Sequence, residues 1–156
     1  MLEVLLNSLL FRRFRAEIVG RRFVACIQSE FAETFLDVLL NLMSLLICVD
    51  KDFRRNLKDF DARYLFKSKD GTITVAAVFY KERLKVSKKQ IDNTNVTVIF
   101  KDQKALMNFL LSSQPDIFNA ILNQELNYEG NLNYLSKFAF MARHLQLMFT
   151  KLATNV

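Results

Sequence analysis

NVTVIFKDQKALMNFLLSSQPDIFNAILNQELNYEGNLNYLSKFAFMARHL, residues 95–145, is the stretch that decides the fold of this chain. Its hydrophobic pattern changes from the alternation of a strand to the three- and four-residue spacing of helices, and then changes back. The elements predicted in order are a strand over residues 94–100, a helix capped by Asp102, a helix with Pro115 in its first turn, a strand over 126–129, and a long amphipathic helix after Gly130-Asn131.

Upstream of this stretch, the pattern predicts a run of closely spaced antiparallel strands. Residues 62–67 and 73–80 alternate with a period of two, and Asp70-Gly71 between them is typical of a hairpin turn. Lys81-Glu82 turns the chain again into a strand over 83–87. We therefore predict an α+β fold with an about five-stranded, mainly antiparallel sheet covered by helices.

The first 60 residues predict a helical extension that packs on a domain formed by residues 61–156. Apolar residues recur at helical spacing over 2–18, and a longer helix is expected over 22–49. The longer helix is apolar nearly all round, with a narrow polar arc of Glu33, Asp37 and Ser44. Such a helix must be covered on more than one side, by the sheet, the first helix, a second subunit, a lipid or a membrane surface.

Composition and charge exclude several classes of protein. The net charge of +6 suits anionic membrane surfaces at least as well as nucleic acid, and no nucleic-acid-binding motif accompanies it, so we expect no nucleic-acid partner. Cys26 and Cys48 form neither a metal spacing nor a redox pair. The N-terminus lacks the charge pattern of a signal peptide, and the apolar run over 35–49 is shorter than the ~20 residues of a membrane span. We expect a cytoplasmic protein.

Catalytic signatures are absent from the sequence. His144 is the single histidine, which argues against a catalytic triad or a histidine-rich metal site, and we expect it to be solvated. Asp59, Asp61 and Glu82 have no spacing from which a carboxylate pair can be read, and the three glycines form no phosphate loop. We expect no enzyme activity, no metal and no cofactor.

The order and spacing of residues 61–149, over half of the chain, resemble the sterol-carrier-protein-2 (SCP2) family of lipid-binding domains. The resemblance rests on the strand over 97–100, on Ala105-Leu106-Met107 after Asp102, on Gln114-Pro115 followed by Phe118, and on Gly130-Asn131 before the long helix. One departure is Leu111-Ser112-Ser113, where the family usually has a glycine-containing segment. The added helical segment and the positive charge are also similar to those of bacterial SCP2-type accessory factors of ubiquinone biosynthesis.

The resemblance implies a non-catalytic carrier with an apolar tunnel between sheet and helices for a lipid, a fatty acyl chain, a sterol-like molecule or an isoprenoid quinone precursor. Aromatic and methionine side chains supply adaptable walls for such a ligand. The last helix or the N-terminal extension is expected to act as a movable cover. The candidate ligand-binding residues are Phe100, Leu106, Phe109, Leu110, Phe118, Leu122, Leu135, Phe138, Met141 and Leu145.

Two other interpretations remain open from the sequence. Phe140 and Leu147 lie seven residues apart on the polar face of the last helix, outside its core stripe. With the apolar helix over 22–49 they could form a homodimer or heteromer interface, which would make the chain a protein-interaction module with a filled core, acting as an accessory subunit. Peripheral membrane contact through the helix over 2–18 is a third interpretation, and it is compatible with lipid carriage.

Overall fold

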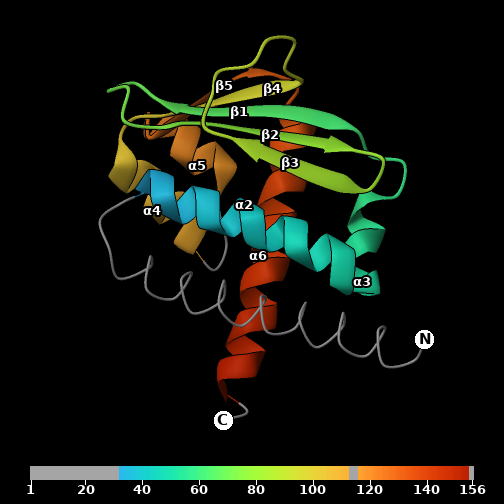
Figure 1. Cartoon of the computed structure of the whole chain (residues 1–156). Helices are drawn as coiled ribbons and strands as arrows, with labels where there is room; N and C mark the ends of the chain where they lie inside the picture. The colour runs from blue at the N-terminus through green and yellow to red at the C-terminus, as the bar shows by residue number, and fades with distance from the viewer. Residues whose placement is uncertain (1–31, 113–115, 155–156) are drawn as a thin grey trace, which may run out of the picture.

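The computed structural model describes residues 32–112 and 116–154, and Figure 1 shows their arrangement. The helix predicted over 2–18, the first part (22–31) of the helix predicted over 22–49, and Pro115 lie outside the described residues. The elements in order are α2 (Ala32–Val49), α3 (Lys51–Arg54), the short 3-10 helix η1 (Arg55–Leu57), β1 (Ala62–Ser68), β2 (Thr74–Tyr80), β3 (Arg83–Ser87), β4 (Val96–Phe100), α4 (Gln103–Leu111), α5 (Ile117–Leu122), β5 (Leu126–Gly130) and α6 (Leu132–Thr154).

The five strands form one sheet in the order β3-β2-β1-β4-β5. Neighbouring strands pair antiparallel except β1 and β4, which pair parallel with Phe66 opposite Val98. A parallel pair needs a crossover, and residues 88–95 supply it by carrying the chain from β3 at the edge back beside β1. The predicted α+β fold with a mainly antiparallel five-stranded sheet is confirmed.

Both predicted hairpin turns are present. Asp70 closes the first by accepting hydrogen bonds at Oδ1 from the Ser68 hydroxyl (2.5 Å) and the Thr72 backbone N–H (3.1 Å). These hydrogen bonds lower the pKa of the Asp70 carboxyl, and the bond from Ser68 has the largest effect. The second turn places Lys81 and Glu82 at φ 48° and 55°, the left-handed pair that a two-residue hairpin requires.

All the described helices cover one face of the sheet (Figure 1). Because side chains alternate along a strand, every second residue points toward the helices, and these inner-face residues are buried. They include Ala62, Tyr64, Phe66, Val75, Ala77, Phe79, Val96, Val98 and Phe100. The hydrophobic core therefore lies between the inner face of the sheet and the layer of α2, α4 and α6.

Helix α2 is the central core helix of that layer. It packs against β2, β3 and α4, and Ser44 in its polar arc donates a hydrogen bond to the Leu84 carbonyl (3.0 Å). By length and composition alone it could cross a membrane, with a mean hydropathy of 1.8 over 18 residues, yet half of it is buried in the fold. The sheet thus covers one side of this helix, which its apolar sequence predicted to be covered on more than one side. The boundary at residue 60 between extension and domain stays a prediction.

Side-chain caps fix where the later helices begin. Asp102 accepts a hydrogen bond from the Ala105 N–H (2.8 Å), as predicted, and Asp116 caps α5 through the Asn119 N–H (3.0 Å). Asn131 accepts from the Asn133 N–H (2.9 Å) at the start of α6, which confirms the predicted cap after Gly130. These caps fix the residue at which each helix begins.

Candidate functional site

The structure brings eight of the ten predicted ligand-binding residues together in the core. They come from β4, α4 and α6 and are all buried: Phe100, Leu106, Phe109, Leu110, Leu135, Phe138, Met141 and Leu145. On α6 these residues follow one another at three- and four-residue spacing, so they form one stripe that faces the sheet. The ring of Phe138 lies 4.7 Å from that of Phe66, and the rings of Phe100 and Phe109 lie 5.8 Å apart.

Phe118 and Leu122 do not join this cluster. Their side chains are 68% and 77% exposed, whereas the sequence predicted them as part of the ligand-binding wall. The reason is the rotation of α5, a helix of six residues that packs with Ile117, Ala120 and Ile121 half-buried against the core. Phe118 and Leu122 are four residues apart and share the opposite face of the helix, which points outward. In this conformation they line no interior site.

The inner face of the sheet adds an aromatic wall that was not among the predicted site residues. Tyr64 and Phe66 of β1 stack with their ring planes 2° apart, and Tyr64 also contacts the rings of Phe79 (5.6 Å) and Phe138 (5.8 Å). The alternation over residues 62–67 already placed Tyr64 and Phe66 on one face of a strand, and it was the signal that could have found them. A ligand between sheet and helices would lie against this wall.

Tyr64 also contributes a polar atom to the interior. Its hydroxyl donates a hydrogen bond to the backbone carbonyl of Tyr134 (2.7 Å), which ties β1 to the first turn of α6. Burial, and to a smaller extent the neighbouring phenol of Tyr134, raises the pKa of Tyr64 far above its ordinary value. The group is therefore a neutral hydrogen-bond donor, and its acceptor is the Tyr134 carbonyl.

The helices are closed over the cluster where α4 meets α6. Between them lies a cavity of about 10 Å³ lined by Phe109, Leu110, Ser112, Ala139, Ala142, Arg143 and Gln146. This volume corresponds to about one water molecule, too little for a lipid chain. The Gln146 side-chain amide donates to the Leu110 carbonyl across the same seam. At this seam a ligand could enter only if α4 or α6 moved.

The titratable side chains that the sequence singled out lie at two places in the described part of the chain. No cluster of three or more His, Cys, Asp or Glu that could hold a metal is found among residues 32–112 and 116–154. His144 is half-buried rather than solvated as predicted, because its ring packs on Phe53 (5.3 Å) and its Nδ1 lies 3.1 Å from the Asn56 amide nitrogen. Asp59, Asp61 and Glu82 line one cavity of about 320 Å³, and the Lys81 N–H donates to Asp61 (3.0 Å).

Comparison with known proteins identifies the fold. No protein-family model and no curated protein sequence matches this chain. Among solved structures, sterol carrier protein 2 from Yarrowia lipolytica in its apo form superposes with a TM-score of 0.57 at 12% identity, over 76% of this chain and 94% of that one. A UbiJ-SCP2 ubiquinone synthesis protein superposes with a TM-score of 0.52 at 19% identity, over 74% and 88%.

A third similar structure is that of an enzyme. The inverting sec-alkylsulfatase Pisa1 from Pseudomonas sp. superposes with a TM-score of 0.53 at 17% identity over 67% of this chain, which spans only 16% of the alkylsulfatase. The shared region is therefore a small part of that enzyme. Taken together, the likenesses show that this chain has the SCP2 fold, and they confirm the resemblance read from its sequence.

Proposed function

We propose that this chain is a non-catalytic carrier that binds a hydrophobic ligand between its sheet and its helices. The ligand class is a lipid, a fatty acyl chain, a sterol-like molecule or an isoprenoid quinone precursor. The SCP2 fold supports the proposal, since sterol carrier protein 2 and a ubiquinone synthesis protein share it. The aromatic wall and the stripe of α6 supply the apolar surface that such a ligand needs.

One observation carries the proposal: α5 is a mostly apolar helix that buries none of its residues. Folded proteins normally turn large apolar side chains inward, because burying apolar surface stabilises by about 25 cal/mol per Å². Phe118 and Leu122 forgo this gain on the outer face of α5. Phe118 and Leu122 would become buried if α5 moved onto an apolar ligand, so the helix is suited to close over one.

The proposed mechanism makes α5 the cover of the site. It follows residues 113–115, which the structure does not describe, and it packs chiefly against β5. Outward movement of the end of α4, which precedes α5 in the chain, would open the seam beside Ala142 and Gln146. The ligand would then replace side-chain contacts at Phe109 and Phe138, and Phe118 and Leu122 would turn onto its exposed surface.

Organic extraction and mass spectrometry of the purified protein is the first test. A stoichiometric fatty acid, quinone or sterol supports the carrier function and names the ligand class. If nothing is bound, the protein is titrated with a fluorescent fatty acid, a sterol and a quinone with a short isoprenoid tail. Failure to bind any of the three rejects the proposal.

A matched pair of surface variants tests the role of α5. The double variant Phe118→Ser/Leu122→Ser removes the two exposed side chains, and Phe140→Ser removes a comparably exposed one (56%) from α6. We expect the double variant to bind the fatty acid at least about tenfold more weakly, since losing contact with two large side chains exceeds 1.4 kcal/mol. Phe140→Ser should bind as the wild type does. Equal affinity in all three proteins contradicts the proposed cover.

A second candidate function is a protein-interaction module, an accessory subunit with a filled core. It is favoured by Phe140 and Leu147, which are 56% and 50% exposed, as the sequence predicted. Together they present two large apolar side chains on one face of α6, next to the half-buried His144. Sedimentation distinguishes the two functions: a tight oligomer without lipid affinity supports the module, and a lipid-loaded monomer supports the carrier.

The cellular setting is a proposal of the same kind. We propose a cytoplasmic carrier that contacts membranes peripherally through residues 2–18, which lie outside the described part of the chain. Vesicle flotation with and without these residues is the test. Salt-sensitive binding to anionic vesicles that disappears on deletion supports the contact, and unchanged flotation contradicts it.

A further inference from the structure

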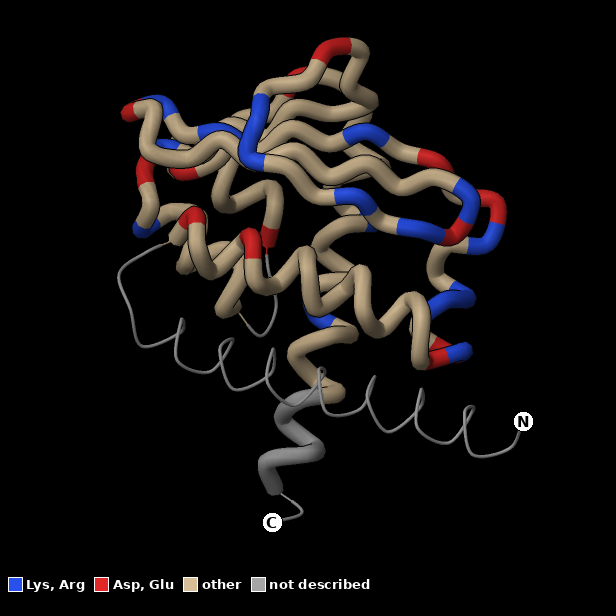
Figure 2. The backbone as a smooth tube through the Cα atoms, in the orientation of Figure 1, with Lys and Arg blue, Asp and Glu red and all other residues tan. Residues whose placement is uncertain are grey.

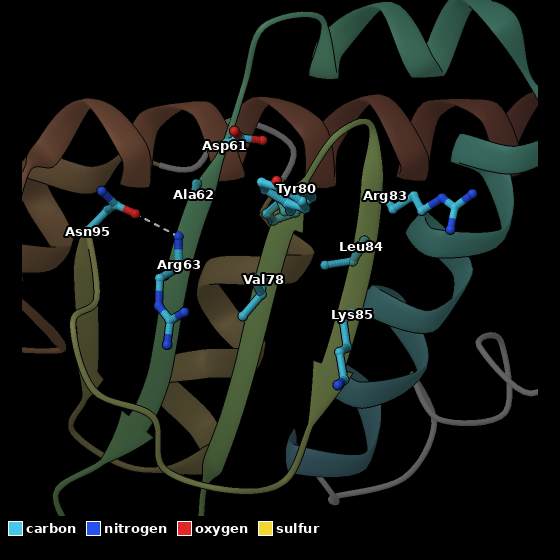
Figure 3. A pocket seen from close by; sticks show the side chains of 10 residues that line it. Asp61, Ala62, Arg63, Val78, Tyr80, Arg83, Leu84, Lys85 and Asn95 are labelled. Carbon is cyan, nitrogen blue, oxygen red and sulfur yellow. Dashed lines mark hydrogen bonds between the residues drawn. The ribbon is translucent and has the colours of Figure 1, made fainter.

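The outer face of the sheet, which the described helices leave uncovered, carries a cavity of about 710 Å³ (Figure 3). It is formed by β1, β2, β3 and Asn95 at the end of the crossover loop. Its lining residues are Asp61, Ala62, Arg63, Val78, Phe79, Tyr80, Arg83, Leu84, Lys85 and Asn95. We call it the outer cleft. None of the ten predicted ligand-binding residues lines it, so it is separate from the carrier site.

Strand register places two cations on either side of an apolar floor. Arg63 of β1 pairs with Val78 of β2, and Val78 pairs in turn with Lys85 of β3. Side chains at paired positions point to the same face, so the three form one row across the strands. Two strand spacings, about 9–10 Å, separate the backbones of Arg63 and Lys85. Figure 3 shows both long side chains running along their strands in the same direction, with Val78 between them.

Tyr80 and Arg83 form the neighbouring pair of the same face. Tyr80 is 55% exposed and extends the apolar floor beyond Val78, and Arg83 lies at the rim on the edge strand (Figure 3). Blue cationic positions are prominent on these strands, whereas most of α2 and α6 is uncharged (Figure 2). The outer cleft therefore combines an aromatic and aliphatic floor with three cations.

The cations of the outer cleft are not neutralised by the fold. In the described part of the chain the ion pairs within 4.0 Å are Arg55–Asp52 and Lys88–Glu33, and neither belongs to the cleft. Asp61 is the one carboxylate among the lining residues, and it accepts a hydrogen bond from the Lys81 N–H (3.0 Å). The lining residues thus carry three positive charges and one negative charge.

Arg63 is held in place before any ligand arrives. Its guanidinium Nη2 donates to the carbonyl of Asp92 (3.0 Å), and its backbone N–H donates to the side chain of Asn95 (2.8 Å). Both partners belong to the crossover loop. A fixed guanidinium loses less entropy on binding an oxyanion, and its remaining N–H groups match the spacing of phosphate oxygens.

We propose that the outer cleft binds an organic phosphate: the phosphate beside Arg63 and Lys85, and an attached apolar group on Val78 and Tyr80. The volume falls within the ~300–1,000 Å³ of small-molecule sites. The concave shape favours a single head group over a flat partner surface. This site is independent of the proposed carrier function, because it uses the opposite face of the sheet.

Phenyl phosphate is the probe, titrated into ¹⁵N-labelled full-length protein and followed by NMR. We expect amide shifts at Val78, Tyr80 and Lys85, and a Kd lower than that for inorganic phosphate. Arg63→Gln and Lys85→Gln should each raise the Kd about tenfold through loss of a charged contact. The matched control is Lys101→Gln, which removes an exposed cation just after β4, outside the cleft, and should leave the Kd unchanged.

Three results overturn the proposal: no saturable shifts, shifts spread over all basic surfaces, or equal weakening in Lys101→Gln. Equal affinity for phenyl and inorganic phosphate overturns the role of Val78 and Tyr80. Flotation with phosphatidylglycerol vesicles identifies the source of the phosphate. Vesicle binding that Lys85→Gln abolishes supports the site with a lipid head group as its ligand. Saturable phenyl phosphate binding without vesicle binding supports it with a free metabolite.

Discussion

Replacing Tyr64 with phenylalanine tests the interior most sharply, because the hydroxyl is buried, hydrogen-bonded and perturbed in its ionisation. The variant loses the donor to the Tyr134 carbonyl and nothing else of its packing. At neutral pH we expect it to be less stable by about 1 kcal/mol, the net worth of one hydrogen bond. The ring contacts with Phe66 and Phe138 are unaffected, so the fold should be retained.

Tyr64→Phe has a larger effect on how the free energy of unfolding changes at alkaline pH. Burial raises the pKa of Tyr64 in the folded state, so above pH ~10 the unfolded chain loses a proton that the folded chain keeps. Stability is therefore constant in this respect below pH ~10 and falls by about 1.4 kcal/mol per pH unit above it. At pH ~11.5 the wild type should have lost about 2 kcal/mol through Tyr64 alone, whereas Tyr64→Phe loses none by this route.

The assay is urea unfolding followed by far-UV circular dichroism between pH 8 and 11.5. The quantity of interest is the difference between wild type and variant, because lysines titrate in the same range in both proteins. Tyr80→Phe is the control, since it removes an exposed tyrosine hydroxyl on the outer face. Parallel slopes for wild type and Tyr64→Phe would refute the reasoning.

Three further predictions concern the frame that holds the site. Gly130→Ala should prevent or severely weaken folding, because the residue has φ +107° and its Cβ would clash with the Asn95 carbonyl oxygen. Gly71 has φ +75° and open space around it, so Gly71→Ala should lower the free energy of unfolding by only about 1 kcal/mol, as measured by thermal unfolding. Asp102→Ala should lose about 1 kcal/mol by removing the cap of α4, which urea unfolding measures. The pKa of Asp70 is lowered in the fold, so its ionised carboxylate stabilises the fold above the unfolded pKa of ~3.9, and this stabilisation is lost on acidification. Asp70→Asn should therefore make stability fall less steeply at acid pH. An unchanged acid dependence of stability would contradict that.

Much of the fold could be predicted from local patterns. Alternation found the strands, and Asp70-Gly71 and Lys81-Glu82 found the two hairpins, because short-range turn chemistry determines them. The cap at Asp102 also followed from residue type. The parallel pairing of β1 with β4 has no local signal in the sequence: it depends on the crossover loop of residues 88–95 and on contacts between distant segments. The sequence predicted a mainly antiparallel sheet but not this pairing.

The candidate site was predictable where helices are long. Four predicted residues of α6 fall in one buried stripe, because 23 residues define a helical face clearly. The six residues of α5 do not define one, and its rotation is set by the half-buried Ile117 and Ile121, which left Phe118 and Leu122 outside. The outer cleft was missed because register between strands, rather than sequence proximity, brings Arg63 and Lys85 together.

The central claim is that an apolar ligand lies between the sheet and the helices, and intermolecular NOEs test it most directly. The protein, labelled at leucine and methionine methyl groups, would be loaded with perdeuterated fatty acid that retains protons only at its terminal methyl. We predict NOEs to the buried methyls of Leu106, Leu135 and Met141. NOEs confined to exposed residues such as Leu147, or a bound fatty acid with no NOE to the core, would contradict the account.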